Sequence, residues 1–115
     1  MHTTSVFLQG VFGFEGHGLE KPAPIDDSLR YVVPLGSTAQ ALYFRGGNSS
    51  DELIVVVLLR GGVPMRYFPI GARGHTHVVL RVVEDLDAGT ELDLHLAAPD
   101  GVTGSVVIDF GLVEV

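Results

Sequence analysis

Two histidines separated by one residue are the strongest candidates for chemistry in this sequence. Side chains two residues apart on a β-strand project to the same face, so His75 and His77 could both reach one metal ion. A later run carries Glu91, Asp93 and His95 at the same spacing. If the two runs pair as neighbouring strands, His77 lies opposite His95, and we expect a three-histidine site for Zn, Cu or Fe. An open coordination position there would suit hydrolytic, hydration or oxygen chemistry.

Both runs also have a simpler explanation, because the solvent-facing side of a sheet is polar. In each run the alternate positions are apolar, which places the histidines on the outward face and the leucines and valines towards a core. Histidine, aspartate and glutamate are ordinary occupants of such a face. The metal site therefore depends on whether 75–83 and 90–97 are neighbours in one sheet.

The segment from Leu86 to Ala98 resembles the corner between strands E and F of fibronectin type III domains. It shares with them a leucine, a Gly-Thr step followed by an acidic residue, and alternating apolar positions. Ala88 stands where those domains carry proline, and Leu92 stands where they carry the corner tyrosine. The resemblance implies an immunoglobulin-like sandwich in which strands E and F belong to different sheets. His95 would then be separated from the other two histidines by the core.

Length and composition indicate a single domain, residues 1–115, with one hydrophobic core. The chain has 46% hydrophobic and 18% charged residues, which is not the composition of a disordered chain. Its net charge of −7 repels phosphate, so we expect neither nucleic acid nor an anionic membrane as a partner. The absence of cysteine excludes disulfides and thiolate metal ligands. The N-terminus lacks the features of a signal peptide, so we expect a cytoplasmic protein, with a mature exported chain as the alternative.

The pattern of apolar residues indicates an all-β fold. Short runs rich in valine, leucine, isoleucine and phenylalanine alternate with turn-forming clusters, and 15 glycines and 6 prolines are spread along the chain. No window carries the apolar stripe of a helix. We expect an antiparallel β-sandwich of about seven or eight strands, with a jelly roll or a short barrel as alternative arrangements. The expected strands are 3–8, 30–35, 39–45, 52–60, 63–68, 75–83, 90–97 and 105–115.

Gly61-Gly62 predicts a two-residue turn that pairs the strands on either side of it. Pairing Arg60 with Val63 sets a register in which Val55 faces Phe68. The strand before the turn is apolar on both faces, whereas a two-layer sandwich buries one face of each strand. Its second row therefore predicts an interface with another copy of the chain, unless the irregular segment 10–29 covers it. The expected interface consists of Leu53, Val55, Val57, Leu59 and Phe68.

These features favour a non-enzymatic binding or assembly module. We expect it to form a homo-oligomer through the apolar row and to present loops or a sheet face to a protein partner. The glycine-rich segments 10–29 and 46–51 would provide such loops, and no nucleophile or phosphate-loop motif is recognisable. The alternative is a small metal-binding protein or metalloenzyme that uses the three histidines. A carbohydrate-binding sandwich is a weaker option, because such proteins display aromatic platforms and the chain has no tryptophan and three tyrosines.

Overall fold

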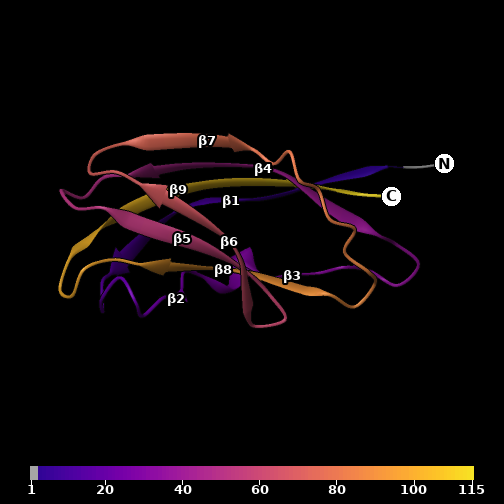
Figure 1. Ribbon diagram of the computed structural model, residues 1–115, viewed down its shortest axis with the longest axis horizontal. Helices are drawn as coiled ribbons and strands as arrows, with labels where there is room; N and C mark the ends of the chain where they lie inside the picture. The colour runs from indigo at the N-terminus through magenta and orange to yellow at the C-terminus, as the bar shows by residue number, and fades with distance from the viewer. Residues whose placement is uncertain (1–2) are drawn as a thin grey trace.

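The computed structural model describes residues 3–115, which fold into nine strands and one short 3-10 helix (Figure 1). Each of the eight predicted segments overlaps one strand, so the all-β fold is confirmed. β2, η1 and the second half of β1 fall in a segment expected to be irregular. The elements are β1 (Thr4–Glu15), β2 (Ala23–Pro24), η1 (Asp27–Leu29), β3 (Tyr31–Val32), β4 (Ala39–Asn48), β5 (Ile54–Arg60), β6 (Val63–Ile70), β7 (His75–Val79), β8 (Glu91–Ala97) and β9 (Thr103–Glu114). Among the described residues, no helix is long and apolar enough to span a membrane.

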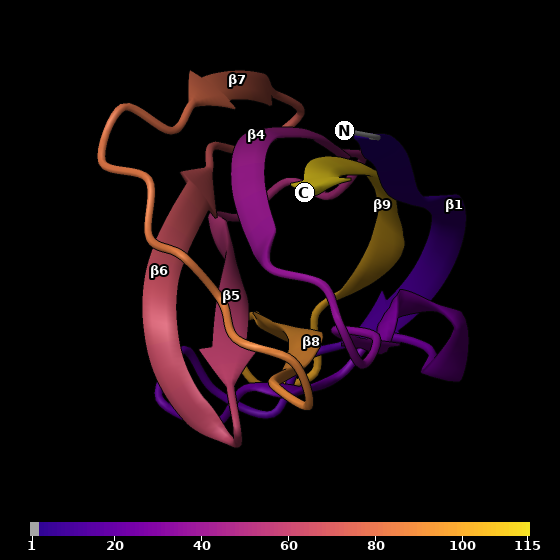
Figure 2. The ribbon, with the colours of Figure 1, turned by 90° about the vertical axis from the view of Figure 1, so that its right-hand side faces the viewer.

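The strands pair from the two ends of the chain inwards. β1 pairs with β9, β2 and β3 with β8, β4 with β7, and β5 with β6, all antiparallel. Sheet A has the order β1-β9-β4-β7, and sheet B has the order β2-β8-β5-β6 with β3 also paired to β8. Figure 2 shows sheet A curving over sheet B. This nested pairing is that of a jelly roll, one of the expected arrangements, and it places β7 and β8 in different sheets.

The core lies between the two sheets and is built from alternate residues of their strands. In β9, Val106, Ile108 and Phe110 are buried, whereas Val107 and Asp109 between them point to the opposite side of sheet A. The same alternation gives the other long strands one core face and one outer face. The sandwich therefore leaves the outer face of sheet A free for polar side chains.

The hairpin between β5 and β6 forms at the predicted turn. Gly61 and Gly62 have φ values of 57° and 80°, the left-handed conformation that a type I′ turn requires. Arg60 pairs with Val63 as expected. The next pair, Leu59 with Pro64, keeps this register, and beyond it the register shifts by one residue because Met65 forms a bulge on β6.

This bulge reverses the faces of the rest of β6 relative to the sequence prediction. Val56 rather than Val55 lies opposite Phe68. Since a shift of one residue turns a side chain to the other face, Phe68 enters the core. There its ring stacks on Phe44 of β4, with centroids 4.3 Å apart and planes 7° from parallel. Phe68 is 3% exposed, so its expected place in an interface is wrong.

The rest of the expected interface row is largely covered within the chain. Val57 lies between His95 of β8 and Tyr67 of β6, whose longer side chains flank it. Segment 10–29 does not fold over this row, because its first residues continue β1, β2 joins the edge of β8, and Leu29 enters the core. The row thus needs no second copy to bury most of it. The exposed fractions are 2% for Val57, 7% for Leu59 and 42% for Leu53, and Val55 is half-buried.

Candidate functional site

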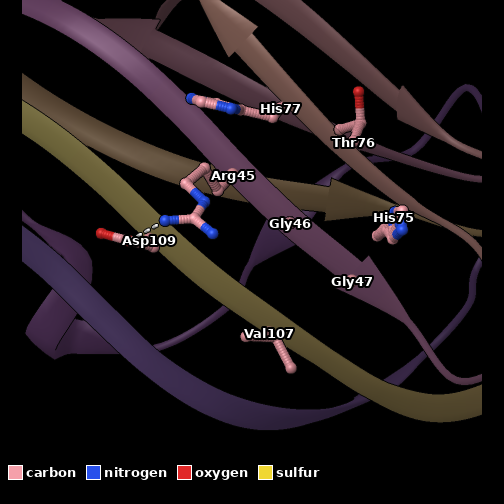
Figure 3. A pocket seen from close by; sticks show the side chains of 8 residues that line it. All are labelled: Arg45, Gly46, Gly47, His75, Thr76, His77, Val107 and Asp109. Carbon is pink, nitrogen blue, oxygen red and sulfur yellow. Dashed lines mark ion pairs between the residues drawn. The ribbon is translucent and has the colours of Figure 1, made fainter.

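The outer face of sheet A carries an open depression with a volume of about 720 Å³ (Figure 3). It lies over β4, with side chains of β7 along one side and side chains of β9 along the other. The depression therefore combines residues from three strands that the chain brings together only on folding. Its lining residues are Arg45, Gly46, Gly47, His75, Thr76, His77, Val107 and Asp109.

Antiparallel pairing arranges polar side chains of this face in a row across all four strands. The row consists of Gln9 on β1, Asp109 on β9, Arg45 on β4 and His77 on β7, each in register with the next. These side chains point outward because their strand neighbours, such as Phe44, point into the core. The row joins hydrogen-bonding groups as far as 100 positions apart in the sequence.

Asp109 is the centre of the polar row. Gln9 Nε2 donates to its Oδ1 at 3.0 Å, and the Tyr43 hydroxyl donates to the same oxygen at 2.8 Å. Burial of the ring, together with the hydrogen bond to the Asp109 carboxylate, raises the pKa of Tyr43, so its hydroxyl remains a donor. Arg45 Nη1 lies 4.0 Å from Oδ2, which is too long for a hydrogen bond. One carboxylate oxygen is therefore engaged, while the other faces the guanidinium across a gap.

Tyr43 is fixed beside the depression by both neighbouring strands. Its ring covers the backbone of Gly111 on β9, where any side chain would collide with the ring. On the other side His77 meets the ring edge-on, with centroids 6.1 Å apart and planes at 88°. These contacts direct the hydroxyl to Asp109 and place an aromatic surface on the same outer face as the charged groups.

The structure separates the three histidines that the sequence suggested as metal ligands. His75 and His77 project from the same face of β7 into the depression, as their spacing predicts. His95 lies on β8 in sheet B, where its Nε2 is 3.0 Å from Asp93 Oδ2. The three-histidine site is therefore wrong, because β7 and β8 are not neighbours and the core lies between their sheets. Among residues 3–115, no group of three or more His, Cys, Asp or Glu is arranged to hold a metal ion.

Sequence reasoning missed the central charged pair of the depression. Arg45 appeared to end a strand before a glycine turn, but Gly46 and Gly47 continue β4. Asp109 lies inside an apolar run, and its place between Ile108 and Phe110 is the one local signal that it faces outward. Nothing local indicates that β4 and β9 are neighbours, so the pair emerges only from the pairing of these strands.

Comparison with known proteins gives a likeness in fold but not in sequence. No protein-family profile matches the chain, and no curated protein sequence matches it. Solved structures do match. The CBM36-1 domain of a multidomain xylanase from the hindgut metagenome of Trinervitermes trinervoides is 15% identical, over 96% of each chain, with a TM-score of 0.58. A carbohydrate-binding module CBM36 in complex with calcium and xylotriose is 20% identical, over 94% of this chain and 97% of that chain, with a TM-score of 0.56.

A third similar structure comes from a protein of another kind. The structure of infectious bursal disease virus Gt strain is 9% identical, over 98% of this chain and 32% of that chain, with a TM-score of 0.54. This chain shares its β-sandwich fold with the two carbohydrate-binding modules and with the matched 32% of the viral chain. Because one fold serves unrelated functions, a proposal about function must come from the site.

Proposed function

We propose that this protein is a non-catalytic binding module that holds a saccharide in the depression on sheet A. The observation that carries the proposal is the gap between Arg45 and Asp109. The two atoms are 4.0 Å apart and not hydrogen-bonded to each other, so a ligand oxygen above the pair can lie within hydrogen-bonding distance of both. Such a group must accept a hydrogen bond from the guanidinium and donate one to the carboxylate.

A hydroxyl group meets both requirements, since it has one O–H donor and two acceptor lone pairs. A ligand carboxylate would be repelled by Asp109, and a ligand ammonium would be repelled by Arg45. The remaining lining is suited to the rest of a sugar. His75 and His77 offer further hydrogen-bonding groups, while Val107 supplies an apolar surface for C–H groups of the ring. A polyhydroxyl ligand therefore fits this depression better than a simple ion.

The same lining favours binding over hydrolysis. Most glycosidases place two carboxyl groups on either side of the bond they cleave. Asp109 is the one carboxylate among the described residues that line the depression. The bound xylotriose in one of the similar structures supports the ligand class. The calcium of that complex is not carried over, because residues 3–115 contain no cluster of ligands suited to a metal ion.

Titration calorimetry with xylotriose, cellotriose and mannotriose tests this function. We expect one of them to bind, and we expect Arg45→Ala to weaken that binding by about tenfold to a hundredfold, as for the loss of a hydrogen bond to a charged group. Arg73→Ala is the matched control, because Arg73 pairs with Asp51 on an exposed surface outside the depression. It should bind like the unaltered chain. Failure of all three sugars to bind, or unchanged binding by Arg45→Ala, would contradict the proposal.

A further inference from the structure

Gly47 forms the floor of the depression, at a position where the strand could carry a side chain. It lies on the outer side of β4, in register with His75 of β7 and Val107 of β9 (Figure 3). These two side chains form walls on either side of bare backbone. β7 and β9 lie on either side of β4, so their backbones are two strand spacings apart, about 9.5 Å. The side chains of His75 and Val107 reduce the width that is open above Gly47.

Neither the backbone conformation nor the packing around Gly47 requires glycine at this position. The φ angle of Gly47 is outside the left-handed region, unlike those of Gly61 and Gly62. A Cβ atom at Gly47 would lie 3.6 Å from Cβ and 3.7 Å from Cγ2 of Val107, which is ordinary van der Waals contact. The preceding Gly46 differs, since a Cβ there would come within 2.8 Å of the buried Phe44 and Ile70 side chains. Packing thus explains Gly46 but not Gly47.

Glycine inside a strand has a cost, because it loses more backbone entropy on folding than other residues and has no side chain to pack. A glycine that neither a turn nor packing requires often marks a place where a ligand approaches the backbone closely. We infer that Gly47 is the contact floor for one sugar ring, which lies against the β4 backbone between His75 and Val107. This inference rests on the proposed function and adds to it the place on β4 where the ligand contacts the backbone.

The test separates stability from binding in the variants Gly47→Ala and Gly47→Val. Both should raise Tm by a few degrees, because they restrict the unfolded chain and valine favours strands. Both should weaken binding of the trisaccharide that binds the unaltered chain, with Gly47→Val reducing affinity at least tenfold. The matched control is Gly13→Ala on β1 of the same face, where a Cβ would meet only Gly104 O at 3.9 Å. It should gain stability without loss of affinity.

Two results would overturn the inference while leaving the proposed function intact. One is a lower Tm for Gly47→Ala, which would mean that the fold requires glycine there. Another is unchanged affinity in Gly47→Val when Arg45→Ala loses binding. If the unaltered chain binds none of the three trisaccharides, the proposed function fails and this inference fails with it.

Discussion

Replacing Phe44 by alanine should lower the free energy of unfolding by about 3–5 kcal/mol, a large part of the stability of a domain this size. Phe44 is fully buried and stacks on Phe68, with ring centroids 4.3 Å apart. The pair connects β4 of sheet A with β6 of sheet B across the core. Truncation removes apolar burial and leaves a cavity that neighbouring strands, held by their hydrogen bonds, cannot fully close.

Urea denaturation followed by circular dichroism would measure this loss. Phe7→Ala is the matched control, because Phe7 lies on β1 of the same sheet but on the outer face, where it is 54% exposed. The control should change stability by about 0.5 kcal/mol or less. Equal losses in the two variants would show that the faces of sheet A are not divided between core and solvent as described.

Replacing Asn48 by alanine should cost about 2–4 kcal/mol, although the residue is polar and ends a strand. Asn48 is buried, and its Nδ2 lies within 3.2 Å of the carbonyl oxygens of Glu52, Ile70 and Gly71. Its Oδ1 accepts hydrogen bonds from the backbone N–H and the hydroxyl of Ser50. Alanine would leave several of these buried groups without a hydrogen-bond partner, and each such group lowers the free energy of unfolding.

Two further variants separate the hydrogen bonds of Asn48 from its volume. Asn48→Asp keeps the shape but has no N–H groups to donate when ionised, so it should destabilise the domain as well. Gln40→Ala removes an exposed amide that donates to Asp85 at 2.7 Å, and it should change stability by about 0.5 kcal/mol or less. Thermal unfolding of all three proteins at one pH would compare them. A fully stable Asn48→Ala protein would contradict the role of this side chain in joining the loop 49–53 to β6.

The burial of Asn48 also corrects an interpretation made from the sequence. The polar run 46–51 was expected to be a recognition loop, yet its first three residues belong to β4 and both Asn48 and Ser50 are buried. A polar composition indicates a loop but does not indicate which polar groups find partners inside the fold. The residues that line the depression lie on strands instead.

Local patterns were enough to predict the strands and the turn between β5 and β6. The alternation of apolar residues marks a strand because successive side chains point to opposite faces, and paired glycines mark a turn because they tolerate positive φ. Both signals act between residues that are close in sequence. For the same reason His75 and His77 could be placed on one face of β7 without knowledge of the fold.

Beyond the β5–β6 hairpin, which strands pair was decided only by the tertiary structure, as was the register of β6 past its first two residues. One bulged residue, Met65, moved Phe68 from the expected interface into the core. The nested strand order placed β8 in sheet B, so His95 lies far from His75 and His77 on β7 of sheet A. The same order made β4 and β9 neighbours, which brought Asp109 within hydrogen-bonding distance of Tyr43, 66 positions earlier in the sequence. Strand pairing depends on how two whole sheets bury their apolar faces against each other, and no short segment contains that information.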